Sequence, residues 1–111
     1  MASNNIFNTV VKTIKAVAIT AGTPVSVWTP STGSRFVLLG WQLSSSAVAS
    51  ILFEDATGSA NEFMRTPVFA ALAQMNSTPG LAYMSNTLNN ALFLDVTGTS
   101  TISGYIFGVE N

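Results

Sequence analysis

Apolar and polar residues alternate along short stretches of the chain, and turn-forming residues separate these stretches. The alternation is clearest in Ala91–Thr97, where Leu92, Leu94 and Val96 share one side. A period of two residues is typical of a strand with one buried face. Turn signals recur about every 8–14 residues, which is typical of an antiparallel sandwich or barrel. We therefore predict an all-β fold, a single-domain antiparallel β-sandwich of seven to nine strands, in Thr9–Thr20, Val25–Thr29, Arg35–Ser44, Val48–Asp55, Asn61–Thr66, Leu81–Ser85, Ala91–Thr97 and Thr101–Val109.

Two segments fit more than one structure. Thr9–Thr20 also has helical spacing through Val10, Ile14 and Val17, although its many β-branched residues favour a strand. Residues 68–75 are rich in alanine and fit a short helix, a loop or an irregular strand equally well.

The stretch Val25–Leu43 combines a strand, a tight turn and a second strand. Pro30 presets its own φ and Gly33 tolerates a positive φ, so Thr29–Gly33 is a turn sequence. Residues 36–39 are apolar without alternation, which is typical of a strand covered on both faces. One face fills the sandwich. The other needs a cover, either another segment of this chain or another subunit.

Charged residues make up 8% of the 111 residues, against about 25% in an average soluble domain. The net charge is -1, so the chain lacks the electrostatic footprint of a nucleic-acid-binding protein. So few charges favour a chain that buries much of its exterior against copies of itself or a partner. The alternative is a neutral β-domain that serine and threonine hydroxyls keep soluble. We prefer the assembly interpretation.

The chain has no histidine and no cysteine, which removes the Ser-His-Asp triad, the thiol nucleophile and the thiolate metal site. Paired carboxylates among Glu54, Asp55, Glu62 and Asp95 would suit glycoside hydrolysis. However, charge beside a hairpin turn normally keeps the loop solvated, and the acidic spacing does not match a calcium loop. We predict no catalytic residue, no metal and no cofactor, and hence no enzymatic activity.

The uncharged window 36–53 just reaches spanning length, about 18 residues. It contains a glutamine and four serines and lies between turns, so we predict no membrane partner, just as we predict no nucleic acid. Residues 1–15 are expected to form an N-terminal arm with the start of the first strand, which reaches a neighbour. Residues 16–111 are expected to form the β-sandwich domain.

The two tryptophans admit two interpretations. Both are candidates for a sugar-binding platform, and both are candidates for core or interface anchors, because large aromatic residues dominate burial. Trp41 lies in line with Val37 and Leu39, which assigns it to a buried row. Trp28 precedes a turn and is expected near a strand end, as a core or interface residue.

Other aromatic residues fall on the outer sides of the predicted strands. Alternation should place polar residues there if these sides faced water. Single surface apolar residues are normal, but several together indicate a contiguous patch, which marks an interface. The predicted interface candidates are Phe93, Tyr105, Phe107, Trp28, Lys12 and Lys15.

Two stretches carry a resemblance to a known group of proteins. They are Val-Ser-Val-Trp-Thr-Pro-Ser-Thr-Gly-Ser-Arg-Phe-Val-Leu-Leu-Gly at 25–40 and Ala-Leu-Phe-Leu-Asp-Val-Thr-Gly-Thr-Ser-Thr-Ile-Ser-Gly-Tyr-Ile-Phe-Gly-Val-Glu at 91–110. The chain resembles the small β-rich structural proteins of tailed-bacteriophage virions, in layout over roughly residues 16–110 and closely only in these stretches. The resemblance implies a jelly-roll-like β-sandwich without enzymatic activity, which forms trimers or clusters bound to a capsid or tail.

We therefore expect a phage head decoration, or cement, protein that binds and stabilises the capsid lattice. Its expected partners are itself, as a homotrimer, and the major capsid protein or another virion protein. It would be made in the host cytoplasm and end on the outer capsid surface of the virion. The alternative is a tail, fibre or baseplate module that binds a host glycan through Trp28, Trp41 and Tyr83. A small carboxylate-dependent hydrolase is a third, weaker hypothesis.

Overall fold

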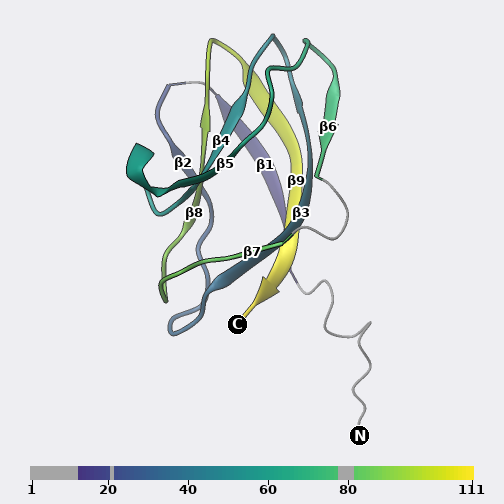
Figure 1. Ribbon diagram of the computed structural model, residues 1–111. Coiled ribbons are helices and arrows are strands. Elements are labelled where there is room, and N and C mark those ends of the chain that lie inside the picture. The colour runs from purple at the N-terminus through teal and green to yellow at the C-terminus, as the bar shows by residue number, and fades with distance from the viewer. Residues whose placement is uncertain (1–12, 21, 78–81) are drawn as a thin grey trace, which may run out of the picture.

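The protein is an all-β sandwich in a computed structural model (Figure 1) that describes residues 13–20, 22–77 and 82–111. This confirms the predicted fold class, and the nine strands of the described residues fall within the predicted number. The strands are β1 (Thr13–Thr20), β2 (Val25–Trp28), β3 (Phe36–Ser45), β4 (Ile51–Asp55), β5 (Glu62–Arg65), β6 (Gln74–Asn76), β7 (Tyr83–Met84), β8 (Leu92–Val96) and β9 (Thr101–Glu110), with a 3₁₀ turn, η1 (Ser59–Asn61), before β5.

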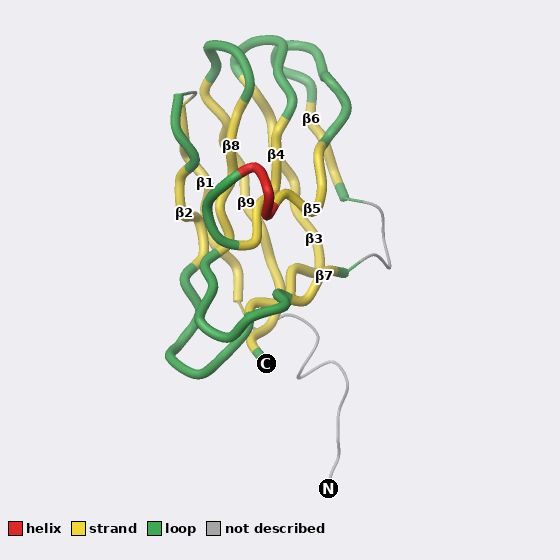
Figure 2. The backbone as a smooth tube through the Cα atoms, turned by 60° about the vertical axis from the view of Figure 1, so that its left-hand side comes forward, coloured by secondary structure: helices red, strands yellow, loops and turns green. Residues whose placement is uncertain are grey.

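The strands form two antiparallel sheets. Sheet A has the order β1-β9-β3-β6, with β7 also paired to β3, and sheet B has the order β2-β8-β4-β5. Apart from the β4–β5 and β6–β7 connections, each connection between consecutive strands crosses from one sheet to the other (Figure 2). This is the double-sheet wrapping of a jelly roll, as predicted.

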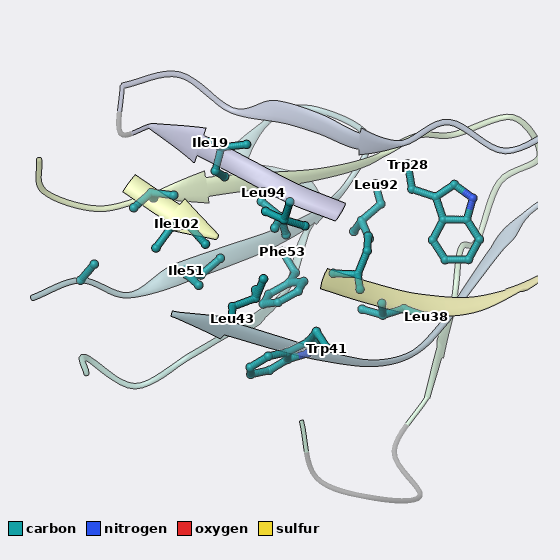
Figure 3. Packing of buried hydrophobic residues seen from close by; sticks show 14 of the residues in the cluster. Ile19, Trp28, Leu38, Trp41, Leu43, Ile51, Phe53, Leu92, Leu94 and Ile102 are labelled. Atoms are coloured by element: carbon teal, nitrogen blue, oxygen red, sulfur yellow. The ribbon is translucent and has the colours of Figure 1, made fainter. Parts of the chain in front are cut away.

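The core fills the space between the inner faces of the two sheets (Figure 3). Trp41 of β3 packs on Phe53 of β4 with ring centroids 5.2 Å apart, which joins sheet A to sheet B. Full burial of a valine, leucine, isoleucine or phenylalanine side chain in this core stabilises the fold by about 1.5–3 kcal/mol. The core residues are Val17, Ile19, Trp28, Phe36, Leu38, Trp41, Leu43, Ala49, Ile51, Phe53, Phe69, Leu92, Leu94, Val96, Ile102 and Ile106.

A bulge in β3 corrects one predicted row. The pairing of β3 with β9 shifts between Leu38 and Gly40, so the extra residue reverses the alternation beyond it. Trp41 therefore points inward with Leu38, whereas Val37 and Leu39 point outward and stay half-buried. Trp41 is buried as predicted, but not in the row of Val37 and Leu39. The hydroxyl of Ser77 accepts the backbone N–H of Trp41 beside the bulge, at 3.0 Å.

Other segment boundaries also differ from the prediction. Residues 68–73 form no helix: Phe69 makes an isolated β-bridge with Ala49, and β6 begins at Gln74. Residues 9–12 and 81, which were assigned to strands, lie outside the described residues. Residues 13–15 are the first three residues of β1, and the rest of the expected arm is outside the described ranges. Within those ranges, no helix is long and apolar enough to cross a membrane.

Candidate interaction surfaces

The outer side of sheet A is a wide surface without charged side chains among the described residues. Its residues follow from the register: Ile14 of β1 lies opposite Phe107 of β9, and Tyr105 of β9 lies opposite both Ala16 and Gln42. Ile14 is 68% exposed and Tyr105 41% exposed. We call this surface the sheet A face and define it by the outward residues Ile14, Ala16, Ala18, Ser103, Tyr105, Phe107, Val109, Val37, Leu39, Gln42 and Ser44.

The charged side chains of the described residues lie elsewhere. Arg65 and Glu62 of β5 form an ion pair at 2.9 Å in sheet B. Lys15 pairs with the inward residue Ile106, so it lies at the inner edge of β1 and not on the sheet A face. The charges of the described residues are therefore kept off the outer side of sheet A.

The polar side chains in the middle of the sheet A face are hydrogen-bonded to each other within the chain. The hydroxyl of Tyr105 donates a hydrogen bond to Oε1 of Gln42 on the neighbouring strand. The ring of Phe107 lies over Gly40, where a Cβ atom would overlap the ring. Because the Tyr105 hydroxyl has a partner within the same chain, another surface could cover it without leaving that donor unsatisfied.

A second exposed apolar group lies at one end of the sandwich, where the β3–β4 and β5–β6 connections meet (Figure 1). The backbone N–H of Leu72 bonds the carbonyl of Ser45 at 2.7 Å, which ties the two connections together. We define the apolar tip as Val48, Val68 and Leu72, which are 60%, 70% and 84% exposed.

The backbone conformation of Leu72 destabilises the single chain. Its φ is +64°, a left-handed conformation that costs a residue with a Cβ atom roughly 1–2 kcal/mol. Its side chain also remains almost fully in water, so burial within this chain does not offset that cost. Strained residues of this kind concentrate at binding and switching sites. Leu72 is therefore the most exposed residue of the tip and also has a strained, left-handed backbone.

The predicted interface residues separate in the structure. Tyr105 and Phe107 lie on the sheet A face, whereas Phe93 is half-buried on the outer side of sheet B, opposite Ser26. Lys15 is exposed at the edge of β1, and Lys12 lies outside the described residues. The set therefore does not form one patch.

Trp28 is a core residue and cannot serve as an interface anchor in this fold. It is 1% exposed, and its Nε1–H donates to Oε2 of Glu110 at 3.1 Å. The other oxygen of Glu110 accepts the backbone N–H of Ser31 at 3.1 Å. These hydrogen bonds from Trp28 and Ser31 lower the pKa of Glu110. Trp28 is buried because it points inward from the end of β2.

The expected sugar platform is also not formed. Trp41 is 6% exposed, and the Tyr83 ring stacks on Phe63 with centroids 3.7 Å apart and planes within 5°. A cavity of about 500 Å³ opens between β5 and the β6–β7 edge, lined mainly by apolar side chains including Trp41, Phe63 and Tyr83. These aromatic residues pack on one another and leave no exposed tryptophan face for a sugar ring.

The prediction of solvated carboxylates beside the hairpin was wrong. Glu54 and Asp55 are 2% and 3% exposed. The loop 56–61 folds back over sheet B (Figure 2), and the backbone N–H of Gly58 donates to Oε1 of Glu54 at 3.2 Å. Local sequence could not reveal this burial, because it depends on where the loop returns.

Asp55 is the centre of a buried polar network. Its Oδ2 accepts hydrogen bonds from the Tyr83 hydroxyl at 2.8 Å and the Asn86 backbone N–H at 2.9 Å. Its Oδ1 accepts from the Ser85 hydroxyl at 2.7 Å and from Nδ2 of Asn90 at 3.0 Å. Burial by itself raises the pKa of Asp55, but the four hydrogen bonds outweigh burial and lower the pKa overall.

The hydrogen bond between Tyr83 and Asp55 shifts the pKa of Tyr83 upward, whereas it shifts the pKa of Asp55 downward. Burial and the neighbouring Asp55 charge raise the pKa of Tyr83 to about 12. The Asp55 carboxylate therefore stays charged and the Tyr83 hydroxyl stays protonated near neutral pH. The network anchors the 83–90 segment to β4 and presents no reactive group to solvent.

No family model, curated protein or solved structure matches this chain. Sequence patterns indicated Tyr105 and Phe107, because alternation in β9 separates them from the buried isoleucines. They missed Ile14 as an exposed residue and the whole apolar tip, because loops carry no periodicity from which exposure can be predicted.

Proposed function

We propose that this protein is a non-enzymatic structural subunit of a virus particle, a head decoration protein that binds the capsid lattice as an oligomer. The observation that carries the proposal is the presence of two separate apolar surfaces on a chain with 8% charged residues. A cement protein needs two kinds of contact, one with its own copies and one with the lattice. The sheet A face and the apolar tip are suited to these two contacts.

The fold and the sequence resemblance support the same proposal. Jelly rolls are common in viral capsid and lectin domains, although a fold by itself does not determine function. The stretches at 25–40 and 91–110 resemble phage virion β-proteins. We propose that copies associate as a homotrimer on the outer capsid surface, and that the major capsid protein or another virion protein is the partner.

Binding of this kind would stabilise the particle by mass action. A protein that binds the assembled lattice and not its dissociated subunits shifts the equilibrium toward the lattice. A standard protein interface buries about 1,600 Å² in total, and each decoration subunit would add contacts of this order. The mechanism requires no catalytic group.

The glycan-binding alternative has less support. Aromatic rings that bind sugars must present an exposed face, and Trp28 and Trp41 are in the core. If the protein bound a host glycan and this binding quenched its tryptophan fluorescence, glycan binding would be favoured over capsid binding.

The test of the proposal is binding to capsids through the apolar tip. We expect the protein to co-sediment with expanded capsids of its own phage and to raise the temperature at which they dissociate. Leu72→Asn should weaken binding at least ten-fold, because asparagine accepts the left-handed backbone but removes the exposed aliphatic side chain.

The matched control is Leu88→Asn. Leu88 is 44% exposed in the connection before β8, at the opposite end of the sandwich. This variant should bind like the unmodified protein. Absence of co-sedimentation at micromolar concentration would contradict the proposed function, and equal binding by both variants would remove the tip as the lattice contact.

A further inference from the structure

We propose that the sheet A face is the surface through which two copies of this chain associate, with the central contact at Ala16 and Tyr105. This inference goes beyond the homotrimer of the proposed function, because a face-to-face contact of identical surfaces joins two copies and predicts a dimer in the purified protein. It concerns the purified protein and does not require binding to a capsid.

The size of the sheet A face is sufficient. Strands lie about 4.8 Å apart and rise about 3.4 Å per residue, so three to four strands of up to ten residues cover roughly 450–600 Å² of flat area. Side chains corrugate this area, so two copies would bury on the order of 1,000 Å² or more in total. That meets the size expected of a specific interface.

The lack of charge favours a second copy as the occupant. A partner that brought charged residues to this face would lose their hydration and find no opposite charge on the face. A second copy brings the same uncharged set of Ile14, Ala16 and Phe107, so the described residues of the face bring no charge that must be desolvated. A two-fold contact of identical surfaces is the commonest way in which soluble proteins associate.

Polar groups on the face do not prevent burial. The hydroxyl of Tyr105, the largest polar side chain at its centre, is already bonded to Gln42 within the same sheet. The positions beside it on β1 are Ala16 and Ala18, whose small side chains let a second sheet approach closely. The surface around Tyr105 is therefore apolar and nearly flat, and its hydroxyl donor is satisfied. Two sheets can pack face to face on such a surface.

The first experiment measures mass in solution. Analytical ultracentrifugation of the full chain should show a dimer that dissociates on dilution. Ala16→Glu should raise the dissociation constant by about 100-fold or more, since each copy would bury an unpaired charge near its symmetry mate. Ser26→Glu is the matched control, because Ser26 is an exposed outward residue on the edge strand β2 of sheet B. This variant should associate like the unmodified chain.

The second experiment uses the absence of cysteine from the chain. Ala16→Cys and Ser26→Cys each introduce a single thiol, and a short bifunctional maleimide then reports which position meets its copy. We expect crosslinked pairs for Ala16→Cys and little crosslinking for Ser26→Cys. Circular dichroism and the melting temperature establish that all four variants are folded.

The outcomes separate this inference from the proposed function. A chain that is monomeric at about 100 μM, or an Ala16→Glu variant that keeps its mass while folded, would overturn the sheet A contact. Capsid binding by such a monomer would leave the decoration function intact. An oligomer that is lost in Ala16→Glu but never binds capsids would support the sheet A contact and contradict the decoration function.

Discussion

At the scale of single residues, Asp55 shows how a carboxylate can be structural. Four uncharged donors surround it, and the described residues place no cation in hydrogen-bond contact with it. Hydrogen bonds to a charged group are worth about 1.5–3 kcal/mol each when net effects are measured. The network thus offsets the cost of burying the charge and attaches the segment before β8 to the core.

Asp55→Asn should destabilise the fold by roughly 2–4 kcal/mol, because the amide replaces one acceptor oxygen with a donor that faces other donors. Urea denaturation followed by tryptophan fluorescence measures the change. Asp95→Asn is the matched control, since Asp95 is half-buried on the outer side of β8, and it should change stability by less than about 1 kcal/mol. Similar losses in both variants would contradict the structural role of Asp55.

The same network predicts an acid dependence. Because the pKa of Asp55 is lowered in the folded state from its usual value of 3.8, its contribution is fully present above that value. The contribution is lost as the pH falls from about 4 through the lowered pKa. The stability of the unmodified protein should therefore drop more steeply below pH 4 than that of Asp55→Asn. Parallel pH profiles of the two proteins would argue against this assignment.

At the scale of elements, β9 and β3 approach each other closely at Gly104. Gly104 of β9 has φ +140°, and a Cβ there would overlap the backbone carbonyl of Gln42. Gly22 in the turn after β1 has nearly the same φ, +139°, but nothing lies within 4 Å of its Cβ position. The two glycines therefore share the backbone strain and differ in the space around them.

Gly104→Ala should be less stable than Gly22→Ala by about 1–3 kcal/mol, the usual cost of forcing extra atoms into packed structure. The comparison of the two midpoints in urea isolates the steric effect, because the φ cost is common to both. If both substitutions cost the same, the close pairing of β9 with β3 at this point would be wrong.

At the scale of the whole molecule, the last strand completes the sheet begun by the first. β9 lies between β1 and β3, so sheet A has no continuous centre until the C-terminal residues are in place. Pairing of segments so distant in sequence makes folding slow, because a large loop must be closed before the contacts form. The sandwich therefore depends on β9 for the pairing that joins β1 to β3.

Deletion of residues 101–111 should leave a chain without fixed structure, because it removes the partner of both β1 and β3 and exposes the core. Far-ultraviolet circular dichroism and loss of the near-ultraviolet tryptophan signal measure this result. Addition of a synthetic peptide of residues 101–111 should restore both signals if β9 acts as described. A deletion variant that melts cooperatively by itself would contradict the central place of β9.

The sequence by itself determined the fold class, most of the strands and most of their inner sides. Ile102 and Ile106 could be assigned inward and Tyr105 and Phe107 outward, because the period of two residues is a local property of a strand. It also indicated assembly through the scarcity of charge. These features require no knowledge of which segments meet.

Only the tertiary structure decided the features that depend on distant segments. The bulge beyond Leu38 reversed the row of Trp41, the returning loop buried Glu54, and the 83–90 segment enclosed Asp55. The position of the β5–β6 connection left Leu72 in water at the tip. Burial and exposure at these positions are set by which segment covers which, and that is a non-local outcome of the order in which the strands cross between the two sheets.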